Sequence, residues 1–505
     1  MSTSERTLFR LAAAASLVLR AVAFFRYRFD ADEQQHAHVA WGWTAGLVQY
    51  RDYFDNHAPL FHLLTAPWLA LVGERPTILL WMRVPMLALF ALMIWCTYVI
   101  GRETYDARTG AWAALLLSLF PPFFLKSLEF RTDNLWTALW LVALVLLVRR
   151  CNPFWIGLVL GAALAVSLKT PLLLVALVVA ALFARRRNWW PALAGFVIVP
   201  AIVLAAFAAM HAWDAMVYCT VTFNGNLART RKTLWIGRAL FPFAFAAVLY
   251  GAWRLRQTQN GWRHFFAVVI GTYVVFLGGF WILISPRDLL PLMPLAAIFA
   301  AAALRTLRAQ AVAVALCLVA LWYYADGFAN RTAWHTTMME QALRLTRPGE
   351  PIIDLKGETI FRPRPFYYAF EYITRAQIAH GILRDTVAAD VIRTRTHVAQ
   401  ADGPMWPPAA RAFLSENFLD MGRLRASGQW LKDDGSFTIA VPGRYVIVTE
   451  RGPAAGTLDG TPYTGARELT AGPHRFAGRK EQTAVVWAPA VERGHSPFRL
   501  RDREF

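Results

Sequence analysis

Apolar runs long enough to cross a bilayer dominate the first two thirds of this chain, and they constrain its fold more than any other feature. A membrane-spanning helix needs roughly 17 to 25 mostly apolar residues. Eleven runs meet or approach this length, near residues 8–27, 80–100, 110–125, 134–148, 153–168, 170–184, 189–209, 234–253, 264–284, 287–304 and 310–328. With 57% hydrophobic and only 17% charged residues, the chain is also far more apolar than an ordinary soluble domain. The sequence therefore predicts an all-α polytopic membrane bundle of about eleven transmembrane helices.

Basic residues outnumber acidic ones by 52 to 33, which gives a formal net charge of +19. The arginines lie in short clusters between apolar runs. This pattern indicates the topology of a membrane protein and not a nucleic-acid-binding surface. The clusters that fall on one side of the expected bundle are Arg102 with Arg108, Arg149 with Arg150, Arg185 to Arg187, Arg254 to Arg263, and Arg305 with Arg308. The positive-inside bias makes this side cytoplasmic, and we expect no nucleic-acid partner.

The composition divides the chain at about residue 329. We predict a transmembrane domain over 1–329, in which the long first loop, 28–79, carries helices that lie along the membrane surface. Its first run resembles a signal peptide, but Arg20 interrupts it, so we expect an uncleaved span. Residues 330–505 lack long apolar runs and predict a soluble domain outside the cytoplasm, with an α+β or β-sandwich-like fold that is mainly β over 431–505.

Ionisable side chains beside membrane spans are costly and are therefore functional candidates. Two acidic segments, "DADE" at 30–33 and "EFRTDN" at 129–134, fall on the side opposite the arginine clusters. Lys169 and Arg287, each between two apolar runs, fall on the same side. Carboxylates and cations gathered at one membrane interface suit the head group of an anionic lipid.

Structural explanations of these residues stay open at this point. The first acidic segment also fits a solvated loop, and Arg131 fits an ion pair at a helix start with Asp133 in the first turn. Lys169 also fits a side chain that extends to the interface, and Arg287 fits a pair with Asp288. His57 fits a hydrogen-bonded loop histidine.

Several segments resemble the GT-C glycosyltransferases of family 39, which include protein O-mannosyltransferases and lipid A aminoarabinose transferases. "DADEQQHAHVAWGWTAGLVQYRDYFDNHAPLFHLLTAP" is similar to the first extracytoplasmic loop of that family. In the family's order, "EFRTDNLWTALWL" resembles the second acidic loop, "SLKTPLLL" the lysine-containing turn, and "PRDLLPLMPLAA" a late arginine segment. The resemblance covers residues 1 to about 305, and the terminal domain matches no particular relative.

This resemblance implies a GT-C fold and an integral membrane enzyme. It would transfer a sugar, with inversion, from a polyprenyl-phosphate carrier to a lipid, polysaccharide or protein acceptor. The setting would be the outer face of a bacterial inner membrane, with the terminal domain in the periplasm.

The resemblance also assigns roles to residues. Asp32 would be the principal acid and the general base, with Glu33 beside it and Asp133 as the second acid. The expected substrate-binding residues are His57, Arg131, Lys169 and Arg287, of which Lys169 and Arg287 would hold the carrier phosphate. Asp288 and Ala58 depart from the family pattern, where an aromatic residue and a proline are common.

The expected chemistry requires no cofactor, because two cations can stabilise a departing lipid phosphate. A Mg²⁺ or Mn²⁺ ion bridging Asp32 and Asp133 stays open as an alternative. Four cysteines, Cys96, Cys151, Cys219 and Cys317, show no metal-type spacing. Two rival classes also stay open: a transporter or lipid-sugar flippase, and a membrane scaffold whose function would survive replacement of Asp32.

Overall fold

This computed structural model describes residues 1–183, 190–226, 234–256, 261–281, 283–401, 406–478 and 481–498. The predicted cluster Arg185 to Arg187 lies outside the described residues. The chain forms two compact units. Unit 1 comprises Met1–Arg51, Asp55–Val72 and Leu79–Thr332, and unit 2 comprises Asp52–Phe54, Gly73–Ile78 and Ala333–Phe505.

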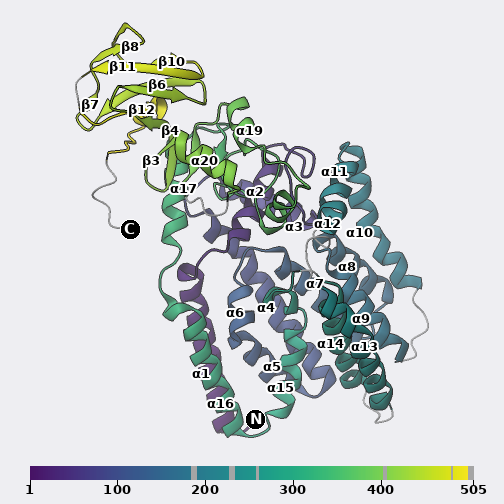
Figure 1. The fold of residues 1–505 in the computed structure, drawn as a ribbon. Coiled ribbons are helices and arrows are strands. Elements are labelled where there is room, and N and C mark those ends of the chain that lie inside the picture. The colour runs from purple at the N-terminus through teal and green to yellow at the C-terminus, as the bar shows by residue number, and fades with distance from the viewer. Residues whose placement is uncertain are drawn as a thin grey trace. The chain divides into compact units, whose positions relative to one another are not determined.

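Unit 1 is built from helices (Figure 1). Its helices are α1 (Thr3–Arg26), α2 (Ala31–Thr44), α3 (Leu60–Val72), α4 (Ile78–Thr104), α5 (Ala107–Leu119), α6 (Pro121–Lys126), α7 (Thr132–Val148), α8 (Pro153–Val166), α9 (Thr170–Phe183), α10 (Trp190–Ala209), α11 (Trp213–Val217), η1 (Tyr218–Thr222), α12 (Phe223–Asn226), α13 (Leu234–Arg256), α14 (Gly261–Phe280), η3 (Pro286–Leu289), α15 (Met293–Ala303), α16 (Leu307–Tyr324) and η4 (Asp326–Phe328).

A helix lies at each of the eleven predicted apolar runs. Among the residues that the structure describes, five helices are by length and composition long and apolar enough to cross a membrane: α1, α4, α10, α14 and α16. Several of the others, such as α7 and α8, are apolar but have fewer than 18 residues. The prediction of a bundle of apolar helices is therefore confirmed, whereas the number of eleven spans is not.

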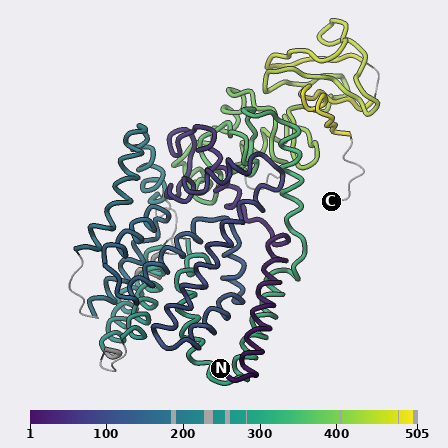
Figure 2. The backbone as a smooth tube through the Cα atoms, turned by 180° about the vertical axis from the view of Figure 1, so that it is seen from behind, coloured from purple at the N-terminus to yellow at the C-terminus, as the bar shows by residue number. Residues whose placement is uncertain are grey.

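Glycines bring two of these helices into close contact. A Cβ added at Gly157 of α8 would lie 1.8 Å from the carbonyl oxygen of Ala192 in α10, and one at Gly161 would lie 2.2 Å from that of Phe196. Gly195 of α10 meets the carbonyl oxygen of Phe154 in the same way. Small residues four apart allow this backbone approach between membrane helices. Figures 1 and 2 both show a second close pair, α1 and α16, which run side by side.

Unit 2 contains α17 (Ala333–Leu345), α18 (Tyr372–Ala379), α19 (Val387–Arg393), α20 (Pro408–Asn417) and α21 (Ala488–Glu492). Its strands are β1 (Ile352–Ile353), β2 (Val398–Gln400), β3 (Phe418–Asp420), β4 (Leu424–Trp430), β5 (Ser436–Ile439), β6 (Gly443–Thr449), β7 (Gly452–Pro453), β8 (Gly456–Leu458), β9 (Thr461–Tyr463), β10 (Arg467–Leu469), β11 (Gly472–Gly478) and β12 (Thr483–Trp487).

These strands form two sheets. The larger has the order β1-β2-β4-β12-β6-β10, with β3 also paired to β4 and β7 to β6, and the smaller has the order β5-β11-β8-β9. Strands β1 and β2 pair in parallel, while the other pairs are antiparallel, as between Val485 of β12 and Ile447 of β6. A core of buried side chains that includes Phe366, Phe370 and Trp406 packs beneath the first strands.

Two short pieces of the first loop belong to unit 2, on either side of α3. The backbone N–H of Phe54 donates to the carbonyl of Tyr367 at 3.3 Å, and the Phe54 ring centroid lies 5.3 Å from that of Tyr368. The guanidinium of Arg362, which is buried, donates to Glu74 at 3.0 Å. Unit 2 is therefore assembled from three separate stretches of sequence.

Candidate active site

The first acidic segment forms the start of α2 through a capping box. The carboxylate of Asp30 accepts a hydrogen bond from the backbone N–H of Asp32 at 3.1 Å, and Glu33 accepts one from the N–H of Asp30 at 2.9 Å. This reciprocal arrangement satisfies N–H groups that a helix start leaves without partners. It also places Asp30 and Asp32 within the same turn.

Glu33 turns away from solvent and binds Arg83 of α4. Arg83 donates to the two Glu33 oxygens at 2.6 Å and 2.9 Å, and the backbone N–H of Phe130 donates at 2.9 Å. With the capping bond from Asp30, Glu33 accepts four hydrogen bonds, which is the lone-pair capacity of a carboxylate. Arg83 also donates to the carbonyls of Tyr27 and Arg28. The pair therefore ties the start of α2 to α4 and to the second acidic segment.

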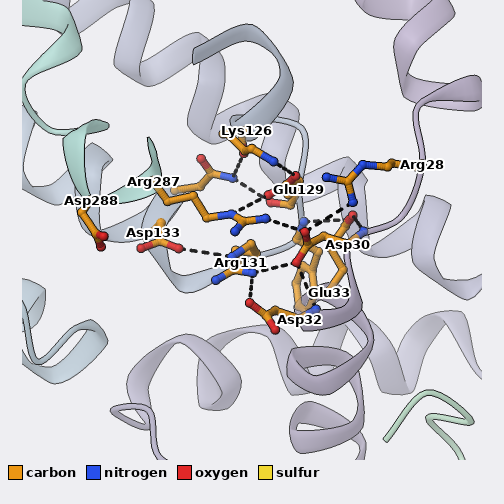
Figure 3. A network of polar contacts seen from close by, with 12 residues as sticks. Arg28, Asp30, Asp32, Glu33, Lys126, Glu129, Arg131, Asp133, Arg287 and Asp288 are labelled. Carbon is orange, nitrogen blue, oxygen red and sulfur yellow. Dashed lines mark hydrogen bonds and ion pairs between the residues drawn. The ribbon is translucent and has the colours of Figure 1, made fainter. Parts of the chain in front are cut away.

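Arg131, the residue before α7, is the centre of the acidic side chains (Figure 3). It donates to Asp30 at 2.9 Å, to Asp133 at 3.2 Å and to Asp32. Burial alone would lower the pKa of Arg131, but the charges of Asp32, Asp133 and Asp30 raise it well above its ordinary value. One guanidinium thus joins the two acidic segments.

Lys169 and Arg287 each bridge two carboxylates. The Nζ of Lys169, in the turn between α8 and α9, lies 2.9 Å from Asp133 and 2.5 Å from Asp288. Arg287 of η3 lies 2.5 Å from Asp30 and 2.9 Å from Glu129. Asp288 therefore pairs with Lys169 and not with the neighbouring Arg287, because its carboxylate also caps η3 at Ser285.

Together these side chains form one connected set, which we call the charge network; Figure 3 labels its members other than Lys169. Two further cations complete it: Lys126 lies 2.7 Å from Glu129, and Arg28 lies 3.6 Å from Asp30. Its members are Arg28, Asp30, Asp32, Lys126, Glu129, Arg131, Asp133, Lys169, Arg287 and Asp288. Five cations and five carboxylates alternate along it. Burial raises the pKa of Glu129 despite the nearby Arg287 and Lys126.

A second cluster surrounds Asp55, in the loop between α2 and α3. The Nδ1 of His57 lies 2.8 Å from Asp55, the Nδ1 of His62 lies 3.8 Å from its other oxygen, and Gln49 donates to that oxygen at 2.6 Å. His36 of α2 meets His62 at 2.9 Å and packs against the His57 ring, with centroids 4.7 Å apart. We call Asp55, His36, His57 and His62 the imidazole cluster.

The imidazole cluster and the charge network act on each other electrostatically through α2. His36 follows Asp32 by one helical turn, and it is fully buried. Burial first, then the charges of His57, His62 and Arg131, lower the pKa of His36 well below its ordinary value, against the opposing charge of Asp32. His57 therefore belongs to the surroundings of the network.

The structure thus joins Asp32, Arg131, Asp133 and Lys169 by direct ion pairs and connects Arg287 to Arg131 through Asp30. It places Glu33 and His57 in adjoining pairs. Sequence analysis missed Arg83, Asp55, His36 and His62 as members of the site. A lone arginine inside an apolar run is costly, and this signal marks Arg83. The short spacing of Asp55, His57 and His62 marks the second cluster.

A metal ion bridging Asp32 and Asp133 does not fit this arrangement, because the same guanidinium binds both carboxylates. Among the described residues, no group of three or more histidine, cysteine, aspartate or glutamate side chains is arranged to hold a metal ion.

Comparisons with known proteins agree with this architecture. Residues 56–213 match a family model described as dolichyl-phosphate-mannose-protein mannosyltransferase. The crystal structure of ArnT from Cupriavidus metallidurans in the apo state is similar, with a TM-score of 0.56 and 13% identity over 83% of this chain and 98% of that one. The same protein bound to undecaprenyl phosphate gives a TM-score of 0.56 and 15% identity over 84% and 98%. A search of curated proteins finds no match.

Proposed function

From the premise of a GT-C glycosyltransferase, which the family match and the shared fold support, we propose the following reaction. The chain transfers a sugar from a polyprenyl-phosphate carrier to an acceptor hydroxyl at the outer face of the inner membrane, with inversion. The observation that carries the proposal is the charge network, which gathers charged side chains from four segments beside apolar helices. The family model and ArnT, by their descriptions, concern proteins that use or bind polyprenyl-type phosphates.

The orientation follows from which helix ends carry the network. Arg131 and Asp133 stand at the start of α7, while Arg149 follows its end. Arg287 stands before α15, and Arg305 follows it. Because arginine-rich turns favour the cytoplasmic side, the network lies at the outer side. The backbone N–H of Arg331 donates to the carbonyl of Arg26, so the chain enters unit 2 from that side, and unit 2 is periplasmic.

Asp32 is the general base in this proposal. Its side chain is 26% exposed, more than that of any other carboxylate in the charge network. An acceptor hydroxyl can therefore reach it, and its attack on the anomeric carbon is helped by transfer of the hydroxyl proton to the carboxylate. A single displacement of this kind inverts the anomeric configuration. Asp133, held by Lys169 and Arg131, is the second acid and keeps these cations in place.

Lys169 and Arg287 bind the carrier phosphate. They are 19% and 15% exposed, and each is already held at a fixed position by two carboxylates. As the bond between sugar and phosphate breaks, its electron pair stays on the phosphate, which gains a negative charge. Cations fixed in advance stabilise this developing charge more than the bound donor. Arg131 and His57 complete the substrate-binding set, and Glu33, with its full set of hydrogen bonds, positions Asp32.

The test compares the purified wild-type chain with Asp32→Asn in nanodiscs. The assay measures release of free polyprenyl phosphate from a panel of polyprenyl-phosphate sugars, with envelope extract as acceptor. We expect a rate loss of roughly 10² to 10⁴ in Asp32→Asn, with donor binding retained. Glu103→Gln, in an exposed ion pair at the end of α4, is the matched control and should keep full activity.

Equal activity of Asp32→Asn and wild type would overturn the assignment of the base. Movement of the lipid-linked sugar across the membrane of proteoliposomes that contain the chain, without release of polyprenyl phosphate, would favour the flippase alternative instead.

A further inference from the structure

Asp55 has no role in the reaction as proposed so far, yet it is buried with several hydrogen-bond partners outside the charge network. It is fully buried, and His57, Gln49 and Gln35 lie 2.8 Å, 2.6 Å and 3.4 Å from its oxygens. Burial alone would raise the pKa of Asp55, but the charge and hydrogen bonds of His57, followed by the charge of His62, hold it below its ordinary value. Asp55 is therefore a buried anion that faces an imidazole.

The geometry of the pair fixes the ring of His57. Because Nδ1 lies at hydrogen-bond distance from Asp55, this nitrogen carries a proton and the ring plane is oriented by the carboxylate. The hydroxyl of Tyr50 donates to the backbone carbonyl of His57 at 2.5 Å, which holds the main chain at the same residue. The side chain of His57 is 27% exposed, so its ring is partly accessible to solvent, whereas those of His36 and His62 are fully buried.

Other titratable groups around His57 come from both neighbouring helices. His36 of α2 packs edge to face against it, and His62 of α3 shares Asp55 with it. The charges of Asp32 and Arg131 act on His36, one ring away. His36 and His62 are fully buried, where burial favours a neutral imidazole. A neighbouring carboxylate favours the charged form of an imidazole. Asp55 therefore stabilises the protonated form of His57, whose ring is partly exposed.

We propose that Asp55 is a positioning residue that holds His57 as an imidazolium, and that His57 is the pH-dependent member of the set that binds the carrier phosphate. This rests on the function proposed above and adds a regulation to the same site. The imidazolium keeps its proton and donates a hydrogen bond to a phosphate oxygen. Lys169, Arg287 and Arg131 stay charged over the physiological range, whereas an imidazole changes its charge between pH 5 and 8. Affinity for the phosphate therefore falls as the pH rises.

The experiment measures binding of radiolabelled undecaprenyl phosphate to the full chain in nanodiscs, from pH 6 to pH 8.5, with undecaprenol as the uncharged competitor. His57→Lys is the matched variant, since a lysine stays charged over this range. Titration of the phosphate itself affects both proteins equally and cancels in the ratio of their affinities. We expect wild type to lose affinity by about tenfold relative to His57→Lys, which is the worth of one charge-assisted hydrogen bond.

Two further variants separate a positioning role from a structural one. His57→Gln should bind weakly at every pH, and Asp55→Asn should move the fall in affinity to lower pH without abolishing binding at pH 6. A wild-type to His57→Lys ratio that is constant with pH would overturn the inference while the proposed function stands. Equal binding of undecaprenyl phosphate and undecaprenol by wild type would overturn the proposed function, and the inference with it.

Discussion

The charge network and the imidazole cluster both bury carboxylates beside the start of α2, but they balance the negative charge in different ways. In the network, the carboxylates face arginine and lysine, as where Arg131 binds Asp30, Asp32 and Asp133. In the cluster, the single carboxylate of Asp55 faces imidazoles and amides. The first region is held by permanent charges and the second by charges that protons control.

This difference suggests a division of labour. Burying charges is costly unless each has partners and hydrogen bonds, and the network meets this condition through alternation along its length. Its arginine and lysine side chains keep their charge over the physiological range, as suits a site that positions a phosphate. The imidazole cluster, unlike the cations of the network, contains groups whose charge can change with pH near neutrality. The predictions below test this contrast, from the largest expected effect to the smallest.

Replacing Arg131 should break the network most severely. Arg131→Gln leaves three carboxylates close together without their shared cation, and we expect the free energy of unfolding to fall by roughly 5 kcal/mol. Thermal unfolding in detergent, followed by circular dichroism, measures the effect. Arg131→Lys keeps the charge but lacks the planar fork of donors that a guanidinium presents to several carboxylates. Its loss of unfolding free energy should lie between those of wild type and Arg131→Gln. An unchanged melting temperature in Arg131→Gln would show that the network is not a structural element.

The second largest loss of stability is expected when the Glu33–Arg83 pair is broken. Glu33→Gln keeps the shape but leaves the buried Arg83 without a counter-charge, at a cost of about 3 kcal/mol in the free energy of unfolding. The double variant Glu33→Gln with Arg83→Met should lose less than the sum of the two single variants, because neither charge is then left alone. Additive losses would mean that the two side chains stabilise the fold independently.

The imidazole cluster should make stability depend on pH. Because the folded state holds the pKa of His36 well below its ordinary value, the unfolded chain binds more protons as the pH falls below about 6.5. The contribution of neutral His36 to the free energy of unfolding is therefore fully present above that pH. Below it, this contribution falls by up to about 1.4 kcal/mol per pH unit. Melting temperatures at pH 7.5 and 5.5 test this. His36→Gln should show a smaller difference, and an equal one would contradict the assignment to His36.

The smallest effect is expected at an ion pair that lies in neither region. Arg102 and Glu103 are 41% and 34% exposed, and solvent screens such pairs. Glu103→Gln should therefore change the free energy of unfolding only slightly. A larger loss, measured in the same thermal assay, would indicate that the contrast between buried and exposed charges is overstated for this protein.

Much of the site was predictable because its residues break the apolar pattern. Asp32, Arg131, Asp133, Lys169 and Arg287 each stand beside an apolar run, and a charge in that position is rarely tolerated without a role. The positions of the apolar runs also predicted where the apolar helices of unit 1 lie. Span number was less predictable, since α7, α8, α9 and α15 are shorter than 18 residues.

The pairing of the charges was not predictable from the sequence. Glu33 and Arg83 lie 50 residues apart and meet because α2 and α4 pack together. Asp288 stands next to Arg287, yet it binds Lys169 from a distant turn. Such choices depend on the three-dimensional positions of helix ends, and local spacing carries no information about them.

The way in which unit 2 takes up pieces of the first loop has a consequence for protein engineering. Phe54 and Glu74, on either side of α3, bind Tyr367 and Arg362 within unit 2. Truncation of the chain after residue 332 would remove the partners of both pieces. The segments on either side of α3, the helix that carries His62, would then lose these contacts. Unit 2 is thus not an appendage that can be exchanged by fusion at one boundary, and a functional chimera would have to transplant residues 52–54 and 73–78 with it.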